Sequence, residues 1–421
     1  MKKKRRRLKK KPIIILGGVI LIFILFISLI SSCSKEEQIE EKRKISFITN
    51  FTNSSAVAID DSIEKTITDF MDLYYLSMKE LTEYNMMHLF SSDAMKQAYL
   101  TQTAMNYLVN YRLAQRNNLR LDDCSYELKV TKVKNSDDKL IVTVLENSSV
   151  KFSFMDITSD SYNIENTFTF KKEKDNYELV EFNKNADFYN VFTLSYKIDS
   201  AKSDNDIKNE LIVLNNEAID LVKASVENEK SYYEAYLNNQ GNKTKKCDHT
   251  YNRELAYSYA MLWVNTRNSE YSAFDSYGGN CQNYASQVMS SGGIPMDLTG
   301  NYKWKWFGST VDETTNEKGR TPSWTGVGQF YNYAKNNSGA GLCASVNVNY
   351  FYAEKGDVMQ VGAKGEYVHS IVVSGLVTKD GKVLDVLTTS NTTDRKNYPL
   401  SAYNYSNKRL IKIHGWNENS N

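Results

Sequence analysis

The sequence predicts an α+β protein with two folded parts that follow an N-terminal targeting segment. The chain has 421 residues, more than one typical compact domain needs. Helical and two-residue hydrophobic periods alternate along it, and an aromatic content of 12% supplies bulk for packed cores. Pro and Gly are scarce before Tyr251 and frequent after it. We therefore expect a basic signal or anchor segment, an extracytoplasmic α+β domain, a helical connector and a C-terminal domain, at residues 1–33, 34–200, 201–250 and 251–416.

The first segment has the features of a membrane tether. Lys2–Lys11 holds nine basic residues and no acidic one, and Ile13–Ile30 is an uncharged apolar run long enough to cross a bilayer as a helix. Positive flanks stay in the cytoplasm, so we expect the rest of the chain on the extracellular face of the cell membrane. The run leads into Ser31-Ser32-Cys33, which resembles the lipobox of bacterial lipoproteins. Cys33 is either lipidated or an incidental part of a retained signal anchor.

The charge distribution argues against nucleic acid as a partner. The formal net charge is +2, but without the nine basic residues of Lys2–Lys11 the chain has 43 basic and 50 acidic residues, a net charge of −7. Binding to phosphates needs a basic face on the folded part.

The cysteines indicate neither a disulfide scaffold nor a metal site. If Cys33 is lipidated and Cys281 stays a thiol, only Cys124, Cys247 and Cys343 remain, which allows at most one bridge. The pair Cys247 and His249 lacks two further ligands at workable spacing. The chain has no Gly-rich phosphate loop either, so we predict no metal and no cofactor.

The N-terminal domain begins with helical periodicity. Apolar residues at helical spacing follow Asp61 or Ser62, either of which suits an N-cap, and a second helix is expected over Ser92–Gln115. Alternating strands follow, with hairpin turns expected at Asn135–Asp138 and Lys174–Asn176. This order of elements resembles the cone-shaped nuclear-transport-factor or SnoaL-like fold. The resemblance implies a spacer, or a docking module for a protein partner.

A long helix is predicted to connect the two folded parts. Asp204 to about Asn239 carries one apolar stripe at helical spacing. Its members are Ile207, Leu211, Leu214, Ala218 and Leu221.

The chemistry-bearing residue of the C-terminal domain is Cys281. Gly278 and Gly279 precede it, and a helix-forming run, Tyr284–Ser290, follows. The thiol is thus expected at a helix N-terminus, where free backbone N–H groups and the helix dipole lower a thiol pKa and can bind an oxyanion. A buried structural cysteine is the alternative.

His369 is the expected base for Cys281. It lies in the run Tyr367–Val373, at the start of a predicted β-branched, buried strand, where a polar ring needs a reason to be present. The other histidines, at positions 88, 249 and 414, fall in the N-terminal domain, the connector and the last strand.

Three segments in order, NCQNYASQ, PSWT and HSIVVSG, resemble the Putative amidase domain family of Gram-positive bacteria, related to the CHAP and NlpC-type cell-wall hydrolases. The resemblance covers about 160 residues, Tyr251–Ile413. It implies a papain-like fold, with a Cys-bearing helix on an antiparallel sheet. It also implies a Cys281 nucleophile and a His369 base that attack an amide bond, with peptidoglycan or a peptide as substrate.

The sequence departs from the family pattern at two places. Asn280 replaces the usual Asp before the nucleophile, and Asn391-Thr392-Thr393-Asp394 stands where the family often has His-Thr-x-Asp. An Asn carbonyl oxygen can orient an imidazole, so Asn391 is the first candidate for the third catalytic residue and Asp394 the second. A plain turn residue is the alternative.

Further site residues are expected around the nucleophile. Trp324, together with Trp304 and Trp306, lies in the sequence between nucleophile and base, where a substrate contact or a core position is expected. Asn283 matches the family box and is expected to fix the active-site loop or contact substrate. The functions consistent with the sequence are a cell-wall amidase or endopeptidase, a peptidase for a protein substrate, and a non-catalytic wall-binding scaffold.

Overall fold

The computed structural model describes residues 46–174 and 176–418, and Ile48–Asn421 forms one compact unit. The predicted apolar span Ile13–Ile30 and Cys33 lie outside the described residues. Within the described ranges, no helix combines the length and apolarity needed to cross a bilayer.

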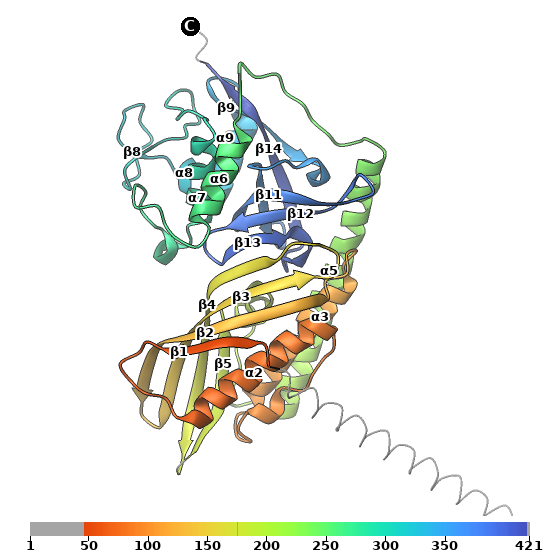
Figure 1. Cartoon of the computed structure of the whole chain (residues 1–421), viewed down its shortest axis with the longest axis vertical. Coiled ribbons are helices and arrows are strands. Elements are labelled where there is room, and N and C mark those ends of the chain that lie inside the picture. Colours follow the sequence, from red (N-terminus) through yellow and green to blue (C-terminus); the bar gives the residue numbers. More distant parts are fainter. Residues whose placement is uncertain (1–45, 175, 419–421) are drawn as a thin grey trace, which may run out of the picture. The chain divides into compact units, whose positions relative to one another are not determined.

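The N-terminal part contains the two predicted helices, α2 and α3, and the predicted antiparallel meander β2 to β5, and it adds a short helix, α4, and strand β1 (Figure 1). The first predicted helix is confirmed, but its N-cap is Asp60 and not Asp61 or Ser62, and Asp60 accepts from the backbone N–H of Ser62. Strand β1 was not predicted, and it pairs with β2 in parallel, so the sheet is mixed. The elements are β1 Ile48–Asn53, α2 Asp61–Glu80, α3 Met95–Ala114, β2 Leu121–Ser136, β3 Lys139–Phe152, β4 Ser159–Glu173, β5 Asn176–Lys184 and α4 Asp187–Thr193.

Helix α5, Asp204–Leu237, is the predicted connector. Ser203 and Asp206 form a reciprocal capping box at its start. Its buried stripe differs from the predicted one, because Leu221 is exposed and the stripe continues through Val222 and Val226. A helix turns 100° per residue, so positions 218, 222 and 226 stay on one face and position 221 leaves it.

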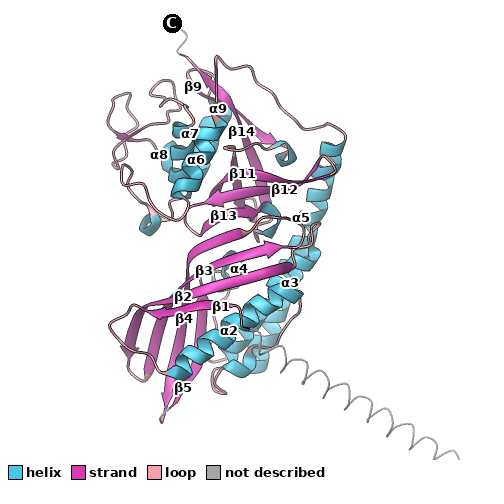
Figure 2. Cartoon of the chain, viewed as in Figure 1, coloured by secondary structure: helices cyan, strands magenta, loops and turns pink. Residues whose placement is uncertain are grey.

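The C-terminal part places helices α6 to α9 beside antiparallel strands (Figure 2). Helix α7 packs on β11 and α9 on β9. The elements are β6 His249–Thr250, α6 Arg253–Trp263, α7 Cys281–Ser291, β7 Trp306–Phe307, β8 Gly319–Arg320, α8 Pro322–Thr325, α9 Val327–Asn336, β9 Gly341–Val348, β10 Val358–Gly362, β11 His369–Lys379, β12 Lys382–Ser390, β13 Asp394–Pro399 and β14 Asn407–Asn417.

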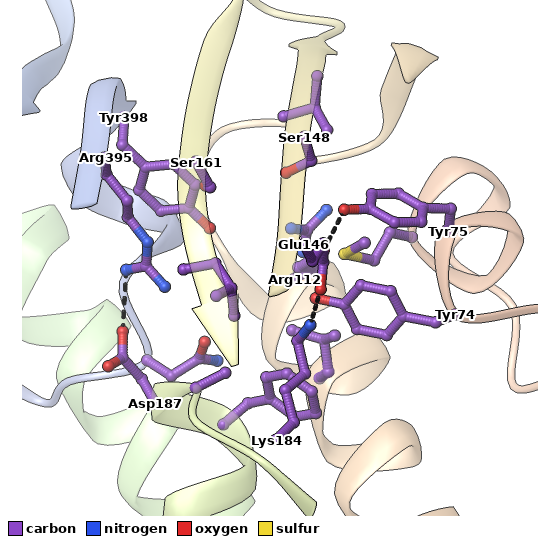
Figure 3. Close-up of a pocket in the computed structure, with 17 residues that line it drawn as sticks. Tyr74, Tyr75, Arg112, Glu146, Ser148, Ser161, Lys184, Asp187, Arg395 and Tyr398 are labelled. Atoms are coloured by element: carbon purple, nitrogen blue, oxygen red, sulfur yellow. Dashed lines mark hydrogen bonds and ion pairs between the residues drawn. The ribbon is translucent and has the colours of Figure 1, made fainter. Parts of the chain in front are cut away.

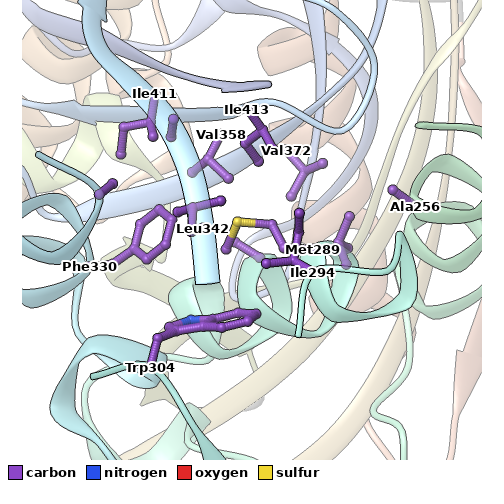
Figure 4. Close-up of a cluster of buried hydrophobic side chains, with 14 of the residues drawn as sticks. Ala256, Met289, Ile294, Trp304, Phe330, Leu342, Val358, Val372, Ile411 and Ile413 are labelled. Atoms are coloured by element: carbon purple, nitrogen blue, oxygen red, sulfur yellow. The ribbon is translucent and has the colours of Figure 1, made fainter. Parts of the chain in front are cut away.

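The core of this part lies between α7 and the sheet (Figure 4). Met289 and Ile294 pack there with Val358, Val372 and Ile411. The alternation of β11 sends Val372 into this core, so the even-numbered residues at the start of β11 face the helix.

One sheet of twelve strands runs through both parts. Its order is β1-β2-β3-β4-β13-β12-β11-β10-β14-β6, with β5 on β4 and β9 on β14. The two halves of β4 pair with different strands: Asn166–Glu173 pairs with β5, and residues 160–162 pair with β13. The sequence suggested two separate sheets, and the β4–β13 ladder joins them. The predicted domain boundaries themselves stay a prediction.

Candidate active site

Cys281 is the first residue of α7, as the sequence predicted. The two preceding glycines have φ of +98° and +118°, a left-handed backbone that glycine adopts without steric cost. The backbone N–H of Asn280 donates to Thr392 Oγ1 at 2.6 Å. The loop before Cys281 is therefore held directly against the turn between β12 and β13.

The Cys281 thiol is buried, with 6% of the residue exposed. Burial raises the pKa of the Cys281 thiol, and hydrogen bonding from the backbone of Ser370, Gln282 and Cys281 itself opposes that rise. The sequence predicted a lowered pKa for this group, and in this conformation the prediction is wrong. The helix N-terminus can be predicted from local sequence, whereas the side chains that cover it cannot.

His369 is the first residue of β11, again as predicted, and its imidazole is buried. Burial lowers the pKa of His369 to about 4; the charge of Asp187 opposes this shift, and the charge of Arg395 adds to it, each by a smaller amount. The ring is therefore neutral at neutral pH and can accept a proton.

The backbone of the strand that begins at His369 lies against Cys281. The side chains of Cys281 and His369 do not hydrogen-bond to each other. Ser370 donates its hydroxyl to Gln282 Oε1 on α7 at 2.6 Å. Within the described part of the chain, His369 Nε2 is buried and has no hydrogen-bond partner. Catalytic hydrogen bonds often tighten only when substrate binds. The Cys281–His369 pair stays a prediction.

Asn391 directly follows β12, close to the loop before Cys281, and is buried. Its Nδ2 donates to the carbonyl oxygens of Trp263 and Val264 at 2.9 and 2.8 Å, and its Oδ1 accepts from Asn280 Nδ2 at 3.0 Å. In the described part of the chain, Asn391 and His369 do not hydrogen-bond to each other. The observed role of Asn391 is to hold the end of α6 and the residue before Cys281.

Asp394, the second candidate, belongs to a network that we call the Arg267 network, made of Arg267, Asp275, Thr392 and Asp394. The Arg267 guanidinium binds both carboxylates in bidentate fashion, at 2.7 to 3.1 Å. Asp394 also accepts from the backbone N–H of Thr392 at 2.8 Å, and Thr392 donates its hydroxyl to Asp275 at 3.1 Å. The network ties the loop before Cys281 to the β12–β13 turn.

Sequence reasoning missed Arg267. Nothing in its local sequence distinguishes it, because its two acidic partners are 8 and 127 residues away. One feature of the sequence could have indicated such a cation. An acidic residue stands on each side of Cys281, and a buried site needs a cation to neutralise the two charges.

Asn283 and Trp324, the two tentative substrate contacts, hydrogen-bond to each other. Trp324 Nε1 donates to Asn283 Oδ1 at 2.9 Å, and Asn283 Nδ2 donates to Ser272 O and Asn280 Oδ1 at 3.0 and 2.9 Å. Trp324 is fully buried and stacks on Trp304, with ring centroids 4.5 Å apart. Asn283 thus fixes the loop before Cys281. A substrate contact by the Trp324 ring would require its covering side chains to move.

Sequence reasoning also missed Gln282, the residue after Cys281. Its amide donates to Ser286 Oγ at 3.2 Å, and its carbonyl accepts from Ser370, which in turn accepts from Gln360 Nε2 at 3.2 Å. This chain of buried hydrogen bonds fixes the start of α7 on β10 and β11.

The partner of Cys247 is another cysteine and not a metal ion. It forms a disulfide with Cys343, with the sulfur atoms 2.07 Å apart, while Cys124 and Cys281 are free. Among the residues that the structure describes, no group of three or more His, Cys, Asp or Glu side chains could hold a metal ion.

Residues 250–414 match the family model described as Putative amidase domain. The matched segment contains α6, α7, β11 and the β12–β13 turn. Neither the curated proteins nor the solved structures include a match to the chain.

Proposed function

We propose that the chain is a cysteine-dependent amidohydrolase whose nucleophile is Cys281. His369 takes the thiol proton, the thiolate attacks the amide carbonyl carbon, and the C–N bond breaks as the amine leaves with a proton from the imidazolium. Water then hydrolyses the thioester, which releases the acid and regenerates the thiol. The backbone N–H groups at the start of α7 are the donors for the oxyanion.

The observation that carries this proposal is the position of Cys281 within the family-matched segment. The thiol begins a helix, backbone groups of Gln282 and Ser370 act on it, and the strand that bears His369 starts beside it. A structural cysteine needs neither a helix N-terminus nor two left-handed glycines before it.

We further propose that the protein acts outside the membrane on peptidoglycan, where it is tethered by its apolar segment or by a lipid on Cys33. The Cys247–Cys343 disulfide supports an oxidising compartment, because disulfides persist outside the cytosol. Peptidoglycan is the abundant amide polymer outside a Gram-positive membrane. The stem-peptide bonds and the bond between muramic acid and L-alanine are the candidate targets.

The test is digestion of purified peptidoglycan by the full chain in detergent micelles, with mass analysis of the products. Wild type should release muropeptides and thereby name the bond, and Cys281→Ala should release none. Cys124→Ala is the matched control, because Cys124 is the second free buried thiol among the described residues and should be dispensable. Cleavage by Cys281→Ala would refute the proposed nucleophile.

A non-catalytic wall-binding scaffold is the second candidate. The observation that favours it is that Cys281 and His369 are both buried and share no hydrogen bond among the described residues. Iodoacetamide distinguishes the two functions, because a nucleophilic thiol alkylates faster than a buried structural thiol such as Cys124. Equal slow alkylation of both thiols, together with wall binding and no cleavage, would establish the scaffold.

A further inference from the structure

A cavity lies where the N-terminal strands meet the start of β13 (Figure 3). Its volume is about 50 Å³. On the same measure of volume, one water molecule needs roughly 10–15 Å³. It therefore has room for about four water-sized groups. None of the residues proposed for amide hydrolysis lines it. The charged and phenolic side chains that line it are Tyr74, Arg112, Glu146, Lys184, Asp187 and Arg395, with Tyr75 and Tyr398 beside them.

The charges in this cavity leave one cation without a carboxylate. Lys184 forms an ion pair with Glu146, and Arg395 forms one with Asp187 at 3.0 Å. Arg112 is buried, donates from Nη1 to the carbonyl oxygen of Leu119 at 3.3 Å, and has no ion pair among the described residues. A buried cation is costly unless an anion accompanies it.

Hydrogen-bond donors in the lining are also unmatched. Arg112 Nε, Arg395 Nε and Asn404 Nδ2 are buried atoms without a hydrogen-bond partner in the described part of the chain. Buried donors in folded proteins almost always find an acceptor. Three donors and one excess positive charge call for a ligand that only accepts and is negatively charged.

We propose that this cavity binds a small carboxylate of about the size of acetate. A planar guanidinium matches a carboxylate through two parallel N–H···O bonds, a geometry that a spherical halide cannot use. The volume suits four non-hydrogen atoms, and the donors of Arg112, Arg395 and Asn404 come from two different parts of the chain. The proposal is independent of amide hydrolysis at Cys281.

The cavity lies close to the residues that hold the loop before Cys281, so binding in the cavity can affect that loop. Arg395 follows Asp394, which belongs to the Arg267 network, and it pairs with Ser161 in the β4–β13 ladder. A carboxylate on Arg395 therefore lies one residue from the groups that hold the loop before Cys281.

The test measures acetate binding to the full chain in detergent micelles, by saturation-transfer NMR and by the thermal unfolding midpoint. Acetate should give a transfer signal and raise the midpoint in a saturable manner. Acetamide, which has the same shape without the charge, and chloride at matched ionic strength should do neither. An equal response to acetamide, or a response to inorganic phosphate alone, would overturn the assignment of a carboxylate site.

Three variants localise the effect. Arg112→Gln should weaken acetate binding by about tenfold or more, since a charge-assisted hydrogen bond is lost. Ser161→Leu should also abolish binding, because Ser161 lines the cavity and the larger side chain fills it without altering a charge. Arg116→Gln is the matched control, since Arg116 is one turn further along the chain, pairs with Glu229 and lies outside the lining. Wild-type affinity in Arg112→Gln or in Ser161→Leu would refute the site.

Discussion

The buried histidine gives the protein an acid-sensitive residue. The pKa of His369 is about 4 in the folded chain and 6.5 when exposed, because burial disfavours the charged ring. The unfolded chain binds more protons between these values, so this contribution to stability is complete above pH 6.5 and is lost as the pH falls through 4. The full effect is about 3 kcal/mol.

His369→Gln should therefore be less sensitive to acid than wild type. The difference in unfolding free energy between the two proteins should change by up to about 3 kcal/mol between pH 7 and pH 4. Urea unfolding at several pH values measures it. Asp385, whose pKa burial raises to about 6, acts in the opposite sense in both proteins and cancels in the comparison. An unchanged difference across this range would contradict the burial of the neutral ring.

We expect the stability of the protein to depend on the side-chain amide of Asn391. Asn391→Asp replaces a donor that serves two carbonyl oxygens with a carboxylate that repels them. We expect a loss of about 2–4 kcal/mol, since two buried acceptors lose their donor. Denaturant unfolding checks this, with Asn397→Asp as a control on a less buried residue of β13. Equal stability of the two variants would indicate that the amide orientation is wrong.

At the scale of elements, the Arg267 network determines how the loop before Cys281 is held. Arg267→Lys keeps the charge and loses the bidentate geometry with two carboxylates. We expect about 1–3 kcal/mol of destabilisation and a larger fractional loss of amidase activity than of folded protein. Limited proteolysis between α6 and α7 provides a second measurement, and cleavage there should accelerate.

Arg253→Lys is the comparison for this variant, because Arg253 also binds a buried carboxylate, Asp357, but lies at the other end of α6. If both variants lose activity equally, the network has no special connection with the nucleophile.

The elements show how far the sequence determines the structure. The start of α7 at Cys281 and of β11 at His369 followed from local signals, namely a glycine pair and an apolar run. The parallel strand β1 and the β4–β13 ladder did not, because pairing between distant strands leaves no local pattern. The burial of Trp324 and the raised pKa of the Cys281 thiol depend on packing from several elements, which periodicity does not report.

At the scale of the whole molecule, the shared sheet should make the two parts unfold together. Tyr111 on α3 donates to the carbonyl oxygen of Ser401, Asn117 donates to Asp385 at 2.9 Å, and β4 pairs with β13. We expect one calorimetric transition for Ile48–Asn421. A fragment that starts at residue 248 should aggregate, since it exposes the edge of β13. Two resolved transitions would contradict this coupling.

The disulfide should contribute strongly to stability. Cys247 and Cys343 are 96 residues apart, and closing a loop of this length removes about 4–5 kcal/mol of chain entropy from the unfolded state in the simplest model. Cys247→Ser with Cys343→Ser should lower the free energy of unfolding by up to this amount, as measured with denaturant. Wild type in reductant should match the double variant, and reductant should leave the variant unchanged.

The same disulfide closes the chain between its cysteines into a covalent ring. The helix that starts at Cys281 and the stacked tryptophans lie inside this ring, and His369 lies outside it. A protease that cuts once within the ring, for example in the exposed segment Glu313–Lys318, therefore opens the backbone without dividing the molecule. Such nicked protein would migrate as one species on a non-reducing gel, with Cys281 and His369 on one covalent assembly, and would separate into two fragments only after reduction.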